Sequence, residues 1–314
     1  MPRASKKFYS IIDRIRPDTI WIVPHQWAIP PLGHVLPHKD VPYHISIHDY
    51  PDAHHPERTI GRDLTTDLVV TVENLYRRAA SRDTISNEMA ADMESRTGAS
   101  ANQILHAGVE PADFEYLEQA VPVNRDVIKI AYAGTIVARQ TVLAFVRSLT
   151  HVRKEIARRI ELHLFSAHTS ASQPWFNREW MIEHGELGAS ELLAHLRECD
   201  WGLAPMELTD ENPRYNRFSL PTKVVSYLAA GLPTICIAHS SSTIAHLAGR
   251  YSLGIQIDET NADRIDEILR VGLSNSEERA RRRLEIVRCA RAEFDAETMR
   301  ARLYTRLCSN TGAR

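Results

Sequence analysis

The stretch Arg217–Ala238, RFSLPTKVVSYLAAGLPTICIA, predicts a helix and a strand in close succession. Pro221 fits the first turn of a helix, where its missing N–H leaves no hydrogen bond unmade. Of the two residues before this proline, Ser219 is the better helix cap. Gly231 suits the left-handed residue that follows a helix, and the apolar, β-branched run after it is typical of a strand covered on both faces. The stretch therefore predicts a loop, a buried helix, a tight turn and a buried parallel strand.

Lys223 is the charged residue in the apolar part of this stretch. The N-terminus of a helix offers free backbone N–H groups and the positive end of the helix dipole, so it attracts anions. A lysine in the first turn opposes that dipole but adds a full positive charge for an anion. We infer a phosphate site here. A solvated lysine on an exposed first turn explains the local pattern equally well.

Composition indicates an ordinary soluble protein. The 314 residues suffice for two domains, and 43% hydrophobic and 25% charged residues are typical of globular chains. A net charge of −2 gives no basic field for nucleic acid, so none is expected as a partner. The four cysteines form no CxxC pair, which favours reduced thiols and a cytoplasmic location. No apolar run approaches the roughly 20 residues of a membrane helix, and the N-terminus lacks the apolar centre of a signal peptide.

Strand-like and helix-like segments alternate along the chain. Ser86 can cap a helix that ends near Gly98, and an amphipathic helix is expected at the N-terminus. Such alternation predicts an α/β fold with parallel sheets and helices on both faces. The predicted strands are 19–24, 43–48, 83–86, 103–108, 127–134, 160–166, 201–205, 233–238 and 253–257. The predicted helices are 87–97, 139–158, 189–199, 221–230, 241–250, 262–272, 276–293 and 296–307.

The polar segment 121–126 contains a proline and has no periodicity, so we interpret it as a linker. It separates two Rossmann-like lobes, one at 1–120 and one at 127–308, followed by a tail at 309–314. Ligands bind such sheets at the carboxyl ends of the strands. In a two-lobed protein this predicts a ligand site in the cleft between the lobes.

Two further patterns of the second lobe carry chemistry. In AYAGTIVAR, Gly134 and Thr135 follow a buried strand, where a glycine lets a phosphate approach the backbone closely. Arg139 comes five residues after the glycine and can reach the same phosphate. In HGELGASELLAHLRECDWGLAP, a loop that starts at His184 leads into a helix and a buried strand. Each pattern alone is common, but their order together with the opening stretch is more specific.

The second lobe, over about residues 127–308, resembles the nucleotide-binding lobe of GT-B glycosyltransferases, particularly glycosyltransferase family 4. The resemblance depends on YAGTI, on HGEL with the segment after it, and most on SLPTKVVSYLAAGLPTI. The last is similar to the family pattern Pro-x-Lys-x-x-(Glu)-Tyr-Leu-Ala-x-Gly-x-Pro. It implies a two-lobed GT-B fold and transfer of a sugar from a nucleotide-diphosphate sugar to a hydroxyl acceptor, with retention, in glycan or polysaccharide biosynthesis.

The resemblance also implies the ligands and the residues that hold them. No metal and no cofactor beyond the donor sugar nucleotide is required. The acceptor would be a glycan, a lipid-linked molecule or a small molecule, and a protein partner or a membrane surface is left open as a further partner. The residues assigned to the donor are Gly134, Thr135, Arg139 and Lys223 at the diphosphate, His184 near the base, and Ser226 near the ribose.

Ser226 departs from the family pattern. The family commonly has a glutamate at this position, five residues before the motif glycine, bonded to the ribose hydroxyls. A serine can make a single hydrogen bond there but not the two-oxygen grip of a carboxylate. Glu207 and Glu211, in the loop before the helix, are candidate replacements, and a solvated loop is the alternative for both.

The first lobe is shorter than the resemblance predicts. VPHQW and SIHDYPD resemble strand ends that carry histidine toward the acceptor. We expect His48 and Asp49 to lie in the cleft and to contact the transferred sugar, or to act as base if the reaction inverts. The alternative for His48 is a strand cap. The family's opening strand, with its glycine-rich loop, has no counterpart before residue 19, so this lobe is predicted to be incomplete.

Seven histidines between residues 25 and 55 leave two rival functions open. With Asp49 and Asp52 nearby, one rival is a metal-dependent hydrolase, although the spacing matches no compact ligand pattern. The other is a non-catalytic GT-B-like protein that binds a nucleotide or a partner. The histidines are His25, His34, His38, His44, His48, His54 and His55.

Overall fold

A computed structural model describes residues 3–53, 61–119, 126–209, 213–275 and 278–311. Two compact units make up the chain: unit 1 comprises Met1–His106, Glu211–Ser219 and Thr298–Arg314, and unit 2 comprises Ala107–Asp210 and Leu220–Glu297. This division differs from the predicted domain boundaries at 107–120, 211–219 and 298–308. The predicted linker 121–126 lies, apart from Asp126, outside the described residues.

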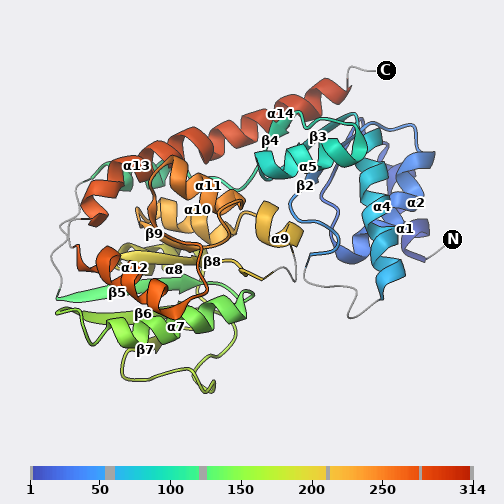
Figure 1. Ribbon diagram of the computed structural model, residues 1–314. Coiled ribbons are helices and arrows are strands. Elements are labelled where there is room, and N and C mark those ends of the chain that lie inside the picture. Colours follow the sequence, from blue (N-terminus) through green and yellow to red (C-terminus); the bar gives the residue numbers. More distant parts are fainter. Residues whose placement is uncertain (1–2, 54–60, 120–125, 210–212, 276–277, 312–314) are drawn as a thin grey trace. The chain divides into compact units, whose positions relative to one another are not determined.

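Unit 1 contains a parallel four-stranded sheet in the order β1-β2-β3-β4 (Figure 1). All five residues of β2 are buried, as expected for a strand covered on both faces. This sheet has four strands where the sheet of unit 2 has six, in agreement with the predicted incomplete lobe. The strands are β1 (Ile20–Ile22), β2 (Tyr43–Ile47), β3 (Ser81–Thr84) and β4 (Gln103–Ile104). Helical segments are α1 (Arg3–Ile15), η1 (Gln26–Ala28), α2 (Ile29–Val35), η2 (Leu36–His38), α4 (Arg62–Arg78), α5 (Asn87–Thr97) and α9 (Pro213–Phe218).

Local signals explain α5 fully and α1 in part. The side chain of Ser86 accepts a hydrogen bond from the Met89 N–H, and Gly98 ends α5 with a φ of 69°, both as predicted. The predicted N-terminal helix is present as α1. Its predicted apolar face is only partly covered, because Ile12 is buried while Ile15 is 62% exposed.

Unit 2 contains a parallel six-stranded sheet in the order β10-β9-β8-β5-β6-β7 (Figure 1). The chain runs outward from β5 through β6 and β7, then crosses to β8 on the other side of β5, so the strand order reverses between β5 and β8. The strands are β5 (Val127–Ala133), β6 (Arg159–Phe165), β7 (Met181–Glu183), β8 (Trp201–Pro205), β9 (Thr234–Ile237) and β10 (Gly254–Ile257).

The helices of unit 2 occur in the order that the sequence predicts, except that the first of them lies before β5 and was not predicted. They are α6 (Pro111–Glu118), α7 (Arg139–Val152), α8 (Ala189–Arg197), α10 (Thr222–Ala229), α11 (Thr243–Arg250), α12 (Ala262–Ser274) and α13 (Glu278–Glu293). The last helix, α14 (Ala296–Thr311), begins in unit 2 and belongs mostly to unit 1. It continues past its predicted end at 307 into the predicted tail.

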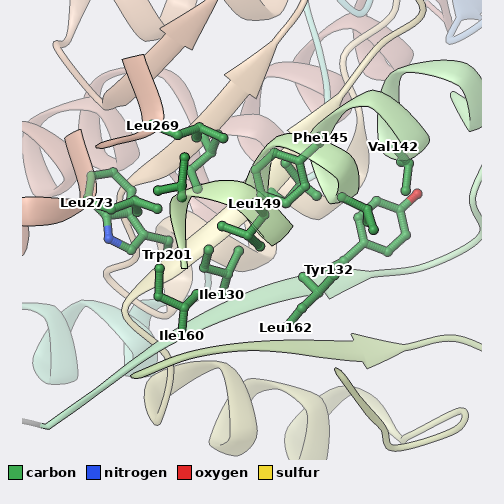
Figure 2. Packing of buried hydrophobic residues seen from close by; sticks show 14 of the residues in the cluster. Ile130, Tyr132, Val142, Phe145, Leu149, Ile160, Leu162, Trp201, Leu269 and Leu273 are labelled. Carbon is green, nitrogen blue, oxygen red and sulfur yellow. The ribbon is translucent and has the colours of Figure 1, made fainter. Parts of the chain in front are cut away.

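A continuous apolar core holds α7 and α12 against the sheet of unit 2 (Figure 2). Phe145 and Leu149 of α7 and Leu269 of α12 are fully buried against Ile130 and Leu162 of the sheet. The apolar residues of α7 recur at helical spacing, so one face of the helix enters this core. The core fixes β5 and β6 beneath α7 and thereby positions the turn that leads from β5 into this helix.

The opening stretch folds nearly as predicted, with one correction. Gly231 has a φ of 67°, and β9 is fully buried between two parallel neighbours. However, α10 starts at Thr222, and Pro221 is its N-cap residue in an extended conformation without a side-chain cap. The predicted cap by Ser219 is therefore wrong. Ser219 lies too far before the helix, and its hydroxyl instead donates to Asp49 Oδ1 at 2.7 Å.

Candidate functional site

The sheet of unit 2 opens at the point where its strand order reverses. Strands β5 and β8 pair over only two residues each, after which Tyr227 of α10 lies between them. Its hydroxyl accepts from the Ala133 N–H at 3.1 Å and donates to the Leu203 carbonyl at 3.0 Å. Gly202 makes room for the ring, since a Cβ there would lie 2.5 Å from Tyr227. This opening at the carboxyl ends of the strands is where parallel sheets bind ligands.

Gly134 and Lys223 meet at this opening. Gly134 directly follows β5 with a φ of 93°, a conformation that disfavours other residues. A Cβ at this glycine would lie 4.0 Å from Cε of Lys223. The Gly134 N–H donates to the Phe165 carbonyl at 2.8 Å, so the glycine contributes close approach rather than a free N–H. The structure thus brings together the two residues on which the predicted phosphate site depends.

Lys223 carries a positive charge that no carboxylate of the described residues neutralises. Its Nζ donates to the Tyr132 hydroxyl at 3.2 Å and lies 4.5 Å from the centroid of that ring. Desolvation by burial lowers the pKa of Lys223 from 10.5 to about 8. The ammonium therefore remains mostly protonated at pH 7, in surroundings that hydrate it poorly. Such a cation gains more from a bound anion than a lysine on an open surface does.

Thr135 and Arg139 lie on the other side of the turn after β5. Both are exposed, and they line a cavity of about 240 Å³ together with the segment that follows β6. The cavity wall includes Ser166, Ser170 and Trp175 but not Lys223. The Thr135 carbonyl accepts the Tyr132 hydroxyl at 2.7 Å, which fixes the turn. The predicted diphosphate residues therefore form two neighbouring groups along one turn. Gly134 lies with Lys223, and Thr135 lies with Arg139.

Glu207 occupies the N-terminus of α7. Its Oε1 accepts from the Gln140 N–H at 2.9 Å, and its Oε2 accepts from the Thr141 hydroxyl at 3.0 Å. A carboxylate thus already satisfies this helix end, which makes the solvated-loop explanation wrong for Glu207. The Arg139 N–H donates to the Val137 carbonyl at 2.9 Å, so the first two backbone donors of α7 are already paired. Glu211 lies outside the described residues.

His184 belongs to a cluster of aromatic rings. Its Nε2 lies 2.9 Å from Nδ1 of His163, its ring stacks on Phe165 with centroids 4.4 Å apart, and His195 lies 5.2 Å away between centroids. Desolvation, followed by the neighbouring histidines, lowers the pKa of His184 to about 4. His184 is therefore neutral at pH 7. It can offer the base of a nucleotide an aromatic edge and a hydrogen bond, but no charge.

Ser226 lies on α10 one turn after Lys223, so the two residues share a face of the helix. Its side chain is partly exposed. The face therefore presents a cation and a hydroxyl where the family pattern has a cation and a carboxylate. The assignment of Ser226 to the ribose stays a prediction.

The structure places His48 and Asp49 in unit 1, directly after β2, and the six donor candidates in unit 2. Asp49 accepts the Ser219 hydroxyl, and Asp52 Oδ2 accepts from Arg214 Nη1 at 2.9 Å. Both partners belong to α9 or the residue after it, an element that the sequence patterns did not predict. Burial, with a contribution from Asp49, raises the pKa of Tyr215 on α9 to about 12. The roles of His48 and Asp49 stay predictions.

The histidines of unit 1 do not gather at a metal-like centre in the part of the chain that the structure describes. No three His, Cys, Asp or Glu side chains there are arranged to hold a metal ion, and His54 and His55 lie outside it. His44 is fully buried, with Nδ1 2.7 Å from Ser81 Oγ and Nε2 2.6 Å from Asp83 Oδ2. Within the same described ranges, no helix is long and apolar enough to cross a membrane.

Comparison with known proteins identifies the fold. Residues 143–280 match a family described as Glucosyltransferase 3-like, C-terminal domain. This region includes His184, Lys223 and Ser226 and starts after Gly134, Thr135 and Arg139. No curated protein matches the chain by sequence.

Solved structures resemble the chain over nearly its whole length. Sucrose-phosphate synthase from Thermosynechococcus elongatus has a TM-score of 0.71 at 11% identity, covering 97% of this chain and 77% of that one. HepE from Anabaena in complex with UDP has a TM-score of 0.69 at 14% identity, covering 97% and 82%. WaaG, a glycosyltransferase involved in lipopolysaccharide biosynthesis, has a TM-score of 0.65 at 12% identity, covering 97% and 95%. The chain therefore has the fold of GT-B glycosyltransferases, as its sequence predicted, and it contains a region similar to the Glucosyltransferase 3-like C-terminal domain.

Proposed function

We propose that this protein transfers a sugar from a nucleotide-diphosphate sugar to a hydroxyl acceptor. One observation carries the proposal: the Lys223 ammonium lies beside the Gly134 turn, where the strand order of the unit 2 sheet reverses, without a carboxylate partner among the described residues. Negative charge grows on the departing nucleoside diphosphate during sugar transfer. A fixed cation at a poorly hydrated site stabilises that charge without reorganising.

The donor residues then have distinct roles. Lys223 and the backbone at Gly134 and Thr135 hold the diphosphate, and Arg139 reaches it from the adjoining cavity. His184 contacts the base as a neutral ring, and Ser226 gives the ribose one hydrogen bond. Cationic side chains neutralise the diphosphate charge that a metal ion neutralises in other enzymes, so the proposed reaction needs no metal. The fold and family resemblance supports this scheme, as does the UDP found with HepE, which has the same fold.

The acceptor side of the proposal rests on unit 1. His48 and Asp49 follow β2, and the Asp49 carboxylate is oriented by its hydrogen bond from Ser219. A hydroxyl acceptor on a glycan, a lipid-linked molecule or a small molecule would meet these residues. Retention of anomeric configuration, a role in polysaccharide biosynthesis and a cytoplasmic location belong to the same proposal through the family resemblance.

A thermal-shift panel of nucleoside diphosphates tests the proposal. A ligand that binds only the folded protein raises its unfolding temperature. We expect UDP or GDP to stabilise the wild type and Lys154→Ala, which removes an exposed lysine of the same unit. The same ligand should stabilise Lys223→Ala much less. A panel without any shift for the wild type overturns the donor site.

A non-catalytic nucleotide-binding protein is the second candidate. It is favoured by Ser226, which cannot replace the family's carboxylate, and by the short sheet of unit 1. The two candidates differ in turnover. Release of nucleoside diphosphate from a nucleotide sugar, in the presence of sugar or lipid-linked acceptors, establishes a transferase. Stabilisation by nucleotide without such release, across UDP- and GDP-sugars, supports the non-catalytic protein.

A further inference from the structure

Tyr132 connects the core of unit 2 to the candidate phosphate site. It is the penultimate residue of β5 and is 1% exposed. Its ring packs in the apolar core beside Val142, and its hydroxyl lies at the margin of that cluster (Figure 2). The predicted donor set does not include this residue, because its position in an apolar strand gives no sign of a polar role.

The Tyr132 hydroxyl connects Lys223 to the turn at Thr135. It donates its proton to the Thr135 carbonyl at 2.7 Å and accepts from Lys223 Nζ at 3.2 Å. A tyrosine hydroxyl has one proton to donate, so the two hydrogen bonds are compatible only in this direction. The same ring lies 4.5 Å beneath the ammonium and attracts it through its π-electrons. One rigid side chain therefore holds both the cation and the turn.

Such an anchor matters because a lysine side chain is long and flexible. Fixing it only when a ligand arrives costs conformational entropy, which reduces affinity, whereas a preformed site avoids that cost. A phenylalanine at position 132 would keep the packing and the attraction of the ring for the ammonium. The hydroxyl is therefore the part that core packing leaves unexplained.

We propose that Tyr132 is a positioning residue of the nucleoside-diphosphate site: its hydroxyl ties the Lys223 ammonium to the Thr135 carbonyl and thereby preforms a phosphate cradle around the Gly134 turn. This proposal rests on the proposed function for its ligand. The link between Tyr132 and Lys223 can also be tested without any nucleotide.

The first experiment measures the reactivity of Lys223 by trace acetylation. Only the unprotonated amine reacts with acetic anhydride, so the pH dependence of acetylation, followed by peptide mass spectrometry, gives the midpoint of its titration. In Tyr132→Phe the ammonium loses a hydrogen-bond acceptor, so the midpoint should fall below that of the wild type. Tyr251→Phe, which removes the hydroxyl that donates to Glu293 elsewhere in unit 2, should leave it unchanged. An unchanged midpoint in Tyr132→Phe overturns the link.

The second experiment measures UDP and GDP affinity by calorimetry. We expect Tyr132→Phe to weaken binding about tenfold or more, the effect of one hydrogen bond to a charged group. Tyr251→Phe should bind as the wild type does. In a Lys223→Ala background, Tyr132→Phe should have no further effect, because it acts through the lysine. Additive losses overturn the positioning role and leave only a structural one.

The two experiments separate the two proposals. If the wild type binds neither UDP nor GDP, the proposed function fails, while the acetylation midpoints still decide whether Tyr132 holds Lys223. If the nucleotide binds and Tyr132→Phe binds it with wild-type affinity, the donor site stands and the positioning role fails. Unfolding temperatures of Tyr132→Phe and Tyr251→Phe that lie well above the temperature of the experiments show that neither result comes from a loss of folding.

Discussion

His44 of unit 1 and Lys223 of unit 2 are both basic side chains that the fold removes from water, but their surroundings differ. His44 is fully buried and pairs with Ser81 and with the carboxylate of Asp83. Lys223 is partly exposed and has a neutral tyrosine as the hydrogen-bond partner of its ammonium. A basic group that is buried with a carboxylate supports the fold. A basic group that is desolvated without a carboxylate lowers stability, and under the proposed function Lys223 gains its charged partner when the diphosphate binds.

Breaking the pair in unit 1 should have the largest effect on stability. Asp83→Ala removes the carboxylate beside His44 Nε2, and removing one partner of a buried pair costs about 3–5 kcal/mol. The free energy of unfolding, measured by urea titration, should fall by that amount. Asp67→Ala, which removes an exposed carboxylate of α4, should change it by less than about 0.5 kcal/mol. Equal values for the two variants would show that the buried pair is not structural.

The contrasting change in unit 2 is Lys223→Met. It replaces a poorly hydrated ammonium by an apolar chain of similar length, so the free energy of unfolding should stay within about 1 kcal/mol of the wild type or rise. Affinity for UDP or GDP should fall about 100-fold or more, the loss of a charge-assisted hydrogen bond with its Coulombic attraction. Urea titration and calorimetry on the same preparation check both parts. A strongly destabilised variant would place Lys223 with His44 as a structural residue.

The pH dependence of nucleotide binding tests whether the charge of Lys223 holds the nucleotide. Desolvation lowers the pKa of Lys223 to about 8, so its charge is present below pH 8 and is lost as the pH rises above it. Nucleotide affinity should therefore fall above pH 8, by at most about tenfold per pH unit. Lys223→Arg stays charged and should remove this fall. Calorimetry from pH 6.5 to 9.5 at constant ionic strength measures it, and a flat wild-type profile contradicts the assigned role.

The same pKa shift predicts the opposite trend for stability. Between pH 8 and 10.5 the folded protein binds fewer protons at Lys223 than the unfolded chain does. The contribution of this residue to stability therefore rises with pH across that window. Lys223→Met lacks this contribution, so its stability relative to the wild type should fall as the pH rises. Urea titrations of both proteins at pH 7.5 and pH 9.5 provide the comparison.

Much of the fold was predictable because the signals are local. The caps of α5, Ser86 and Gly98, act within one helix, and the α10–β9 stretch contains its own turn. The prediction failed where a partner is distant in the sequence or an element is short. The predicted cap Ser219 hydrogen-bonds Asp49, 170 positions away. Strand β7 has three residues, and one of them is buried, so neither its length nor its pattern identifies it.

The candidate site was predictable in part for the same reason. Gly134 and Lys223 are identified by the motifs in which they occur, and the structure brings them together. The cap of α7 by Glu207 joins positions 66 apart at Thr141, and the contact of His184 with His163 joins positions 21 apart. The spacing of apolar residues along the sequence gives no sign of such pairs, because side chains from different elements meet only after the sheet has formed. The functional roles themselves stay predictions.

The smallest effect concerns Ser226, on the same helix face as Lys223. Ser226→Glu restores the carboxylate of the family pattern, which can accept from two ribose hydroxyls where serine offers one bond. Affinity for UDP should rise about three- to tenfold and affinity for 2′-deoxy-UDP should rise less, because only the ribose presents both hydroxyls. Ser226→Gln is the uncharged control, and calorimetry measures the wild type and both variants. If both nucleotides gained equally, the new carboxylate would act away from the ribose, and the assignment of this face of α10 to the nucleoside would be wrong.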